Sequence, residues 1–400
     1  MDEDVYFHKN ITFRAWKQDL RFRVSQALFS SHDVDTGTRF LLRTIIDAGY
    51  QPRHVLDPGC GYGPLGLTLK SLHPESTVHM VDRDALAVEY SRQNAGLNGL
   101  SGVDIYGSLG YDDVKSNDFD LITSNIPGKA GEPVIAYLLG EARHYLASGG
   151  LAAVVVVAPL EETVAKILGE TPGAEIVLRR NRSGHAVFHY KFSGEATPQK
   201  PPQDSIKRGI YHRKDVRMSV ENIEYPMQTA YGLPEFDSLS YGSEMLVKAL
   251  AYAKGMKVRR AVVFNPGQGH VPVAVWKLVA PDYISLLDRD LLALRYSQLN
   301  LVLNGCPADI VVVSHQVGID SSGEKADLII GALREGEGRE ASFLTLDTAA
   351  EQLSSNGMVI ISAGSTAVTR LVSHAESAGI LRVRARERWK GNSLLVLVHA

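Results

Sequence analysis

The chain has 400 residues, of which 44% are hydrophobic and 22% charged, and its formal net charge at pH 7 is -3. This length favours two domains, and the composition is that of an ordered globular protein. The small negative charge excludes a chain that is basic throughout, and no apolar run is long enough to predict a membrane span. Two cysteines are too few for a disulfide framework and lack metal-ligand spacing, so we expect a cytoplasmic protein without a metal site.

In chain order, the first half alternates apolar strands with helix-length segments. Strands are expected at residues 54–56, 78–81, 119–123 and 151–158, and helices from residue 64, at 85–95 and at 134–146. This alternation is typical of a parallel sheet. Residues 176–190 contain two apolar stretches around a short polar turn, which predicts an antiparallel hairpin at the sheet edge.

A polar, proline-rich segment at residues 194–203 divides the chain into halves and is typical of an exposed linker. Residues 81–91 are echoed by residues 287–297, and residues 97–99 are echoed by residues 303–305 at the same separation. The sequence therefore predicts a tandem duplication of one α/β unit, each a mostly parallel, seven-stranded Rossmann-like sheet with a terminal antiparallel hairpin. The predicted domains are 1–193 and 207–400, joined by a linker at 194–206.

A glycine-rich turn at residues 55–63 follows the first strand, and Asp82 closes the next. An acid at the second strand end suits a ribose diol. Asp57 before the glycines would repel a pyrophosphate but suits the sulfonium and amino groups of S-adenosylmethionine. The alternative is a tight connection without a ligand. The predicted cofactor contacts are Asp57, Gly59, Gly61, Gly63, Asp82, Arg83, Ser108 and Asn125, with Arg83 and Ser108 near the adenine.

The turn at residues 125–129 follows the strand expected beside the first one, at the sheet edge where open parallel sheets bind ligands. The carboxamide of Asn125, with a neighbouring carbonyl held by Pro127, can accept hydrogen bonds from an amino group and orient its nitrogen towards a methyl donor. We therefore predict Asn125 and Pro127 as catalytic residues. The same residue types favour turns anywhere, so a simple turn is the alternative.

The second half differs where the first carries these groups. Aligned on the Pro-Gly-x-Gly pattern, Asn265 stands in the place of Asp57 and Val271 in the place of the third glycine. The apolar segment 331–333 replaces the turn after Asn125. We expect the first unit to be active and the second to be degenerate, although Asp288 leaves open a remnant ligand pocket.

Together, residues 20–192 resemble the small-domain methyltransferases related to ribosomal RNA small subunit methyltransferase C and large subunit methyltransferase G. The resemblance rests on the segment 27–42, the glycine turn, Asp82, the Asp-Leu-Ile stretch at 120–122 and the turn from Asn125. It implies two copies of one fold and transfer of a methyl group from S-adenosylmethionine to the N2 amine of a guanine in ribosomal RNA. The expected substrate contacts are Phe29, Asp35, Gly37 and Lys129.

This chain departs from that family in three respects. The usual Asn-Pro-Pro-Phe turn lacks its aromatic residue here, Ser108 replaces an acid that commonly reaches the adenine amine, and the intact copy is the first instead of the second. These departures leave open a methyltransferase for a small molecule or a protein amide. A non-catalytic protein that binds S-adenosylmethionine or RNA is the alternative from another class.

Basic and aromatic residues occur together before each unit, at residues 7–23 and 207–217. Such mixtures suit RNA, through phosphate contacts and base stacking. They also suit a solvated β-ribbon whose aromatic side chains pack inward. Arg179, Arg180 and Arg182 on the predicted terminal hairpin present the same choice.

Overall fold

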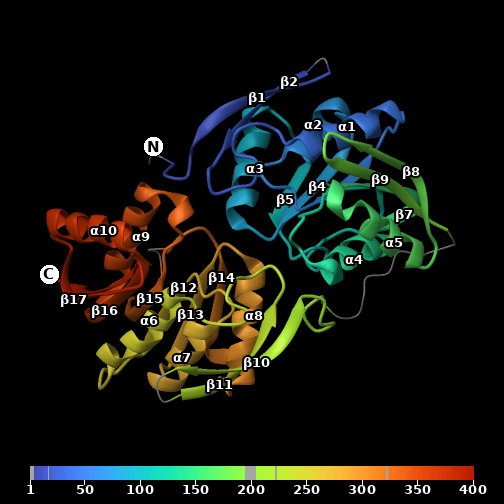
Figure 1. The fold of residues 1–400 in the computed structure, drawn as a ribbon. Coiled ribbons are helices and arrows are strands. Elements are labelled where there is room, and N and C mark those ends of the chain that lie inside the picture. The colour runs from blue at the N-terminus through green and yellow to red at the C-terminus, as the bar shows by residue number, and fades with distance from the viewer. Residues whose placement is uncertain (1–3, 17, 194–203, 221–222, 321–322) are drawn as a thin grey trace. The chain divides into compact units, whose positions relative to one another are not determined.

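The computed structural model describes residues 4–16, 18–193, 204–220, 223–320 and 323–400. The chain divides into two compact units (Figure 1). The first unit is Phe7–Tyr211, and the second is His212–Ala400 together with residues 4–6. Most of the predicted linker, residues 194–203, lies outside the described residues. Ser205, which follows it, donates through its backbone N–H to Asp112 Oδ1 at 3.0 Å within the first unit.

The first unit contains a seven-stranded sheet in the order β5-β4-β3-β6-β7-β9-β8. Its strands pair in parallel except at the end, where β9 is antiparallel to both β7 and β8. The strands, with the hairpin β1-β2, are β1 (Lys9–Ala15), β2 (Gln18–Val24), β3 (His54–Pro58), β4 (Thr77–Asp82), β5 (Val103–Gly107), β6 (Phe119–Asn125), β7 (Leu146–Val157), β8 (Ala174–Arg182) and β9 (His185–Phe192). The helices are α1 (Thr36–Asp47), α2 (Pro64–Leu72), α3 (Ala85–Leu97), α4 (Glu132–Gly140) and α5 (Glu161–Glu170), with 3-10 turns η1 (Glu141–His144) and η2 (Ala158–Leu160).

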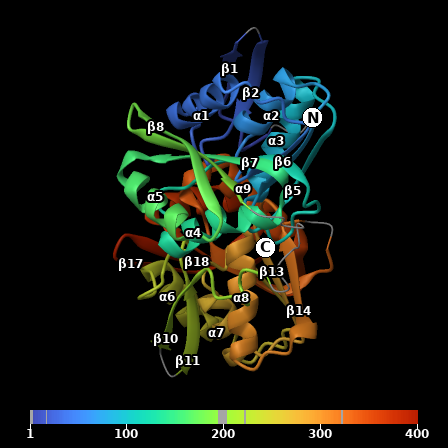
Figure 2. The same cartoon turned by 90° about the vertical axis from the view of Figure 1, so that its right-hand side faces the viewer.

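Helices cover both faces of this sheet because its central strands are apolar on both sides. Alternate residues of β9 illustrate the two faces: Ala186 and Phe188 join the apolar cluster with α4 and α5, whereas His189 contacts Thr44 of α1. The strand β8 lies beside α1 in both views (Figure 1, Figure 2). Because β3, β4 and β6 run parallel, the turns that follow them meet at one sheet edge.

The second unit repeats this architecture, with a sheet in the order β14-β13-β12-β15-β16-β18-β17 and a preceding hairpin β10-β11. The strands are β10 (His212–Val220), β11 (Ile223–Ala230), β12 (Arg260–Phe264), β13 (Tyr283–Asp288), β14 (Val311–His315), β15 (Ala326–Ala332), β16 (Leu353–Gly364), β17 (Leu381–Trp389) and β18 (Asn392–His399). The helices are α6 (Tyr241–Ala249), α7 (His270–Leu278), α8 (Leu291–Leu303), α9 (Arg339–Gln352) and α10 (Ser365–Ala378), with η3 (Leu250–Ala253), η4 (Ala308–Ile310) and η5 (Glu335–Glu337).

The predicted fold class is confirmed: each unit is a mostly parallel seven-stranded sheet that ends in an antiparallel hairpin. One boundary differs, because the helix expected at 134–146 ends at Gly140, and β7 already begins at Leu146. In the ribbon β1-β2, the aromatic residues Phe13 and Phe22 are buried. Their inward packing is the structural alternative to base stacking that the sequence left open.

Candidate active site

The glycine turn after β3 is tied to the end of β4 and faces open space. The backbone N–H of Gly59 donates to Val81 O at 2.8 Å, and that of Gly61 donates to Asp82 Oδ2 at 2.9 Å. Both glycines have positive φ, 80° and 58°, and a Cβ added at either would meet no atom within 4 Å. The turn therefore offers backbone against which a ligand can lie.

Gly63 has a different role in the same turn. It caps α2 with a φ of 101°, and a Cβ there would lie 2.8 Å from Leu67 Cδ1 and 3.1 Å from Met80 Cε. Its lack of a side chain serves the close packing of α2 on β4. A contact of Gly63 with the cofactor stays a prediction.

Asp57 lies fully buried at the end of β3, beneath the turn. Its Oδ2 accepts a hydrogen bond from Gly66 N at 2.9 Å, whereas its Oδ1 is buried without a partner among the described residues. Burial raises the pKa of Asp57 to about 7, and the nearby charge of Asp82 adds to this rise. An unpartnered carboxylate oxygen at this depth is stabilised by positive charge nearby, which fits a sulfonium cofactor.

Asp82 is half-buried at the end of β4. Each carboxylate oxygen accepts one backbone hydrogen bond, from Gly61 N and from Asp84 N, both at 2.9 Å. Burial and the charge of Asp84 raise the pKa of Asp82 to about 6. A carboxylate oxygen can accept a second hydrogen bond, so Asp82 can still bind a diol. The residues of this turn therefore fit the predicted cofactor.

The two residues predicted to contact the adenine, Ser108 and Arg83, are less available to a ligand than Asp82. Ser108, directly after β5, is buried and donates its hydroxyl proton to Gly110 O at 2.9 Å while accepting from Asp113 N at 3.1 Å. Its side chain thus closes the loop of which it is part. Arg83 is half-buried beside Asp82. Adenine contacts of both residues stay predictions.

Asn125 ends β6 at the same sheet edge, and its amide orientation is determined by two partners. Its Nδ2 donates to Asp35 Oδ2 at 3.0 Å and to Thr38 Oγ1 at 3.1 Å. Because a carboxylate can only accept, the NH₂ group must face Asp35, and this leaves the amide oxygen of Asn125 as the acceptor for another group. Asp35 also caps α1 by accepting from the backbone N–H of Gly37 at 2.9 Å. Asp35 thus fixes the orientation of the Asn125 amide, and the substrate contacts predicted for Asp35 and Gly37 stay predictions.

The turn beyond Asn125 is exposed at Pro127 and Lys129. It closes by a hydrogen bond from Ala130 N to Pro127 O at 3.1 Å. Phe29 is 73% exposed. No described interaction joins Phe29 or Lys129 to Asn125, so their substrate contacts stay predictions.

Sequence reasoning missed Thr38 and His185. A Cβ added at Gly37 would lie 2.7 Å from His185 Cδ2 and 2.9 Å from Asp35 Oδ2, so Gly37 leaves the room that these two side chains occupy. The helix-start pattern of Asp35, an acid before glycine, threonine and an apolar helix, is a signal for Thr38. No local pattern marks His185, which reaches this place through the β8-β9 hairpin.

The corresponding turn of the second unit can be matched by backbone conformation. Gly63 and Gly269 both precede a helix, with φ of 101° and 97°, and Gly61 and Gly267 have φ of 58° and 56°. This register retains the third glycine as Gly269. The prediction that Val271 replaces it is wrong, because the aligned pattern was displaced by two residues.

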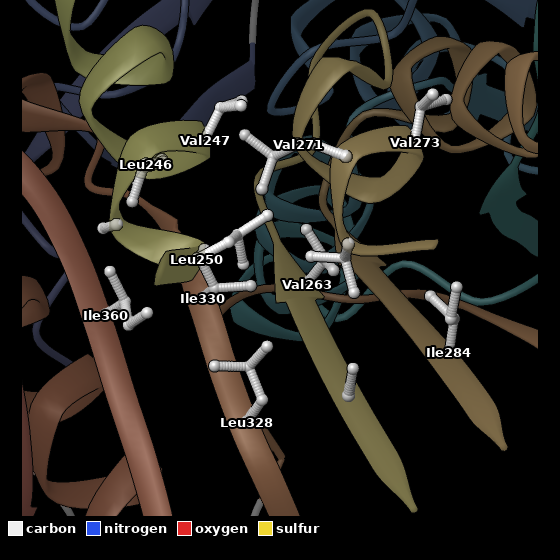
Figure 3. Packing of buried hydrophobic residues seen from close by; sticks show 14 of the residues in the cluster. Leu246, Val247, Leu250, Val263, Val271, Val273, Ile284, Leu328, Ile330 and Ile360 are labelled. Carbon is white, nitrogen blue, oxygen red and sulfur yellow. The ribbon is translucent and has the colours of Figure 1, made fainter. Parts of the chain in front are cut away.

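The same register places Val263 opposite Asp57, and Asn265 opposite Gly59. The prediction that Asn265 replaces the leading acid is therefore wrong: the acid has become Val263, which is fully buried in the apolar cluster on β12 (Figure 3). Asn265 adopts a φ of 50°, which Asn tolerates, and its Nδ2 donates to Ala332 O at 2.8 Å. Ala332 ends β15 as Asn125 ends β6.

Ion pairs occupy the rest of this second site. Arg334 pairs with the buried Asp288, and Arg289 Nη1 lies 3.0 Å from Glu337 Oε1. Burial raises the pKa of Asp288 to about 6 even with Arg334 beside it. The cavity that remains has a volume of about 10 Å³, room for about one water molecule and far less than a nucleoside needs.

The first unit matches a known family in sequence. Residues 19–182 match the family described as methyltransferase small domain. The uncharacterized protein YbxB of Bacillus subtilis (strain 168) is 40% identical over 145 residues, which cover 35% of this chain and 70% of that protein. The chain belongs to the methyltransferase small-domain family. The predicted enzyme class, a methyltransferase that uses S-adenosylmethionine, is thereby confirmed.

Other similarities concern named RNA methyltransferases. Ribosomal RNA small subunit methyltransferase C of Pseudomonas putida (strain GB-1) is 42% identical over 104 residues, 26% of this chain and 30% of that protein. The chain thus spans less than half the length of this relative. A T. thermophilus 16S rRNA N2 methyltransferase, solved with AdoMet and guanosine, matches with a TM-score of 0.67 at 16% identity and 99% coverage of both chains. At this identity the match shows a shared fold, here across both units of the methyltransferase.

Within the described ranges, none of the helices of this methyltransferase is long and apolar enough to cross a membrane. Among the same residues, no group of three or more His, Cys, Asp or Glu side chains is arranged to hold a metal ion.

Proposed function

We propose that the first unit methylates the exocyclic N2 amine of a guanine in ribosomal RNA. The observation that carries this proposal is the amide of Asn125, whose NH₂ group is held by Asp35 and Thr38 so that its oxygen remains as an acceptor for a ligand near the glycine turn. The activities named for the small subunit methyltransferases C and for the T. thermophilus enzyme support it. A ribosomal substrate would place the protein in the cytoplasm.

The chemistry needs little beyond binding and orientation. The cofactor supplies, when bound, a methyl group on a sulfonium that is already activated for transfer. Asp57 and the turn would hold its positively charged end, and Asp82 its ribose. The amide oxygen of Asn125 would accept an N–H of the guanine amine and so direct the nitrogen lone pair at the methyl carbon.

The bond changes in this step balance without a protein base. A nitrogen–carbon bond forms while the sulfur–carbon bond breaks, and the sulfonium becomes a neutral thioether. The methylated nitrogen then releases its proton to water. Asn125 therefore acts by alignment, in keeping with a side chain that cannot take up a proton.

The test is methyl transfer from labelled S-adenosylmethionine to small-subunit ribosomal RNA transcribed without modifications. Nucleoside analysis should find N2-methylguanosine. The Asn125→Ala variant should lose about 100-fold or more of the rate while calorimetric titration finds unchanged cofactor binding. Cofactor binding without N2-methylguanosine, or full activity of the variant, would contradict the proposal.

A further inference from the structure

An arginine-rich cleft lies between α1 and the edge strand β8, outside the site described above. Its volume is about 620 Å³. Figures 1 and 2 both show β8 beside α1, so the cleft is framed by a helix and a sheet edge. The lining residues are Phe40, Arg43, Thr44 and Asp47 of α1, Glu161 of α5, and Arg179, Arg180, Asn181 and Arg182 of β8.

Three of these arginines are uncompensated. Arg43, Arg180 and Arg182 are exposed, and within the described part of the chain they form no ion pair. Arg179 differs, since its Nε lies 2.8 Å from Glu161 Oε1 and its guanidinium also pairs with Glu162. Asp47 adds one negative charge, so the cleft retains a net positive charge.

The floor of the cleft adds no charge of its own. Thr44 Oγ1 lies 2.9 Å from Nε2 of the buried His189. Burial lowers the pKa of His189 to about 4, and the nearby charge of Arg180 contributes to the lowering. His189 is therefore neutral at physiological pH, and the positive charge of the cleft belongs to its exposed arginines.

Both walls of the cleft lead to the candidate active site. On α1, Thr38 binds Asn125, and Arg43 follows five residues later, roughly 7.5 Å further along the helix axis. On the other wall, Arg182 ends β8, and the turn after it leads to His185, which lies against Gly37. A chain bound along the cleft would thus end near Asn125.

We propose that this cleft binds the phosphate backbone of the single-stranded RNA segment next to the target guanine. Guanidinium groups bind phosphates in a fork geometry, and three of them spread over a helix and a strand suit successive phosphates better than one small anion. Phe40 in the lining offers an aromatic surface to a neighbouring base. The inference rests on the proposed function, because it identifies how the same substrate is held.

The test compares RNA affinity and its salt dependence in two variants of equal charge. The cleft variant carries Arg43→Ala, Arg180→Ala and Arg182→Ala. The control carries Arg370→Ala, Arg382→Ala and Arg388→Ala, three exposed arginines of the second unit that are likewise unpaired in the described structure. The probe is a fluorescein-labelled 20-nucleotide single-stranded RNA, titrated by fluorescence anisotropy at several salt concentrations.

The cleft variant should bind this RNA at least about 10-fold more weakly than the parent. The plot of log affinity against log salt should become less steep, with the magnitude of its slope smaller by about 2. This is the value for three lost phosphate contacts on a single strand. The control should bind like the parent, and both variants should bind S-adenosylmethionine normally. Equal weakening in the two variants, or none in the cleft variant, would overturn the proposal.

The parent protein separates failure of the cleft from failure of the proposed function. If the parent methylates ribosomal RNA and the cleft variant binds and methylates it equally well, only the cleft assignment falls. If the parent binds no RNA and methylates an acceptor of another class, the proposed function falls and the cleft assignment with it. Displacement of bound RNA by a polyglutamate peptide at equal concentration would also count against a phosphate site.

Discussion

The two units build the same turn at the same place in the sheet, but they differ in the carboxylates around it. In the first unit Asp57 and Asp82 lie under and beside the turn, and the space above Gly59 is free. In the second, Val263 replaces the buried acid, and Arg334 neutralises the remaining one. The comparison teaches that this fold requires the backbone of the turn and not its carboxylates.

A second difference supports the same conclusion. Gly66 N donates the hydrogen bond that Asp57 Oδ2 accepts. In the matched register the second unit has Pro272 at this helix position, and proline has no N–H. The acceptor and the donor have thus disappeared together, so that neither is left without the other.

The largest contrast is expected when the two strand-end acids are removed in turn. Asp82→Ala should weaken S-adenosylmethionine binding about 100-fold, because two hydrogen bonds to a charged acceptor are lost. Asp288→Ala should leave cofactor affinity unchanged, since Arg334 already occupies that carboxylate. Calorimetric titration of both variants measures this, and the parent should bind one cofactor per chain. Weaker binding in Asp288→Ala would show that the second site is not closed.

The contact that orients Asn125 should affect the rate next. Asp35→Asn retains a side chain that caps helices well but can turn an NH₂ group towards Asn125, so kcat should fall about 10-fold with little change in cofactor affinity. The matched control is Ser240→Ala at the cap of α6 in the second unit. That change should cost about 1 kcal/mol of stability and leave kcat intact.

If Asp35→Asn is as stable as the parent, a lower kcat reflects the orientation of Asn125 and not a loss of folded protein. If Asp35→Asn retains full kcat, the hydrogen bond to Asn125 does not orient the amide. If instead kcat falls in proportion to lost stability in both variants, Asp35 acts only as a helix cap.

Much of this comparison could be predicted from the sequence, because its signals are local. Apolar strands, glycines and strand-end acids identified the duplication and the cofactor turn. The register of the second turn was misjudged because the Pro-Gly-x-Gly pattern around Asn265 matches the first turn better than the conformationally equivalent residues do. Contacts between Asn125 and Asp35 or Thr38 join distant chain segments, and no local period encodes them.

The buried acid of the first unit should give the ligand-free protein a pH-dependent stability. The pKa of Asp57 is about 7 in the folded protein and near 4 in an unfolded chain. Between these values the folded state holds a proton that the unfolded state has lost, so the free energy of unfolding falls as the pH rises. Asp57→Asn retains an acceptor for Gly66 N and should raise stability at pH 8 by about 1–3 kcal/mol relative to the parent.

Urea unfolding at pH 5 and pH 8, without cofactor, measures this effect. The free energy of unfolding of Asp57→Asn should exceed that of the parent by more at pH 8 than at pH 5. Asp309→Asn, at an exposed position of the second unit, is the control. It should change the free energy of unfolding by the same amount at pH 5 and at pH 8. The same pH slope in Asp57→Asn as in the parent would contradict a raised pKa for this acid.

The smallest effects should come from the residues that the two units share. Ser91 Oγ donates to Gly61 O at 2.8 Å, and Ser297 Oγ donates to Gly267 O at 3.3 Å; both serines are fully buried. Ser91→Ala and Ser297→Ala should each cost about 1 kcal/mol in urea unfolding, because each leaves a half-buried glycine carbonyl with one partner fewer. Only Ser91→Ala should also weaken the binding of S-adenosylmethionine, because Asp288, the strand-end acid beside the second turn, is already paired with Arg334. Equal cofactor affinity in both variants, with equal loss of stability, would mean that the serine holds the turn for folding alone in the first unit as in the second.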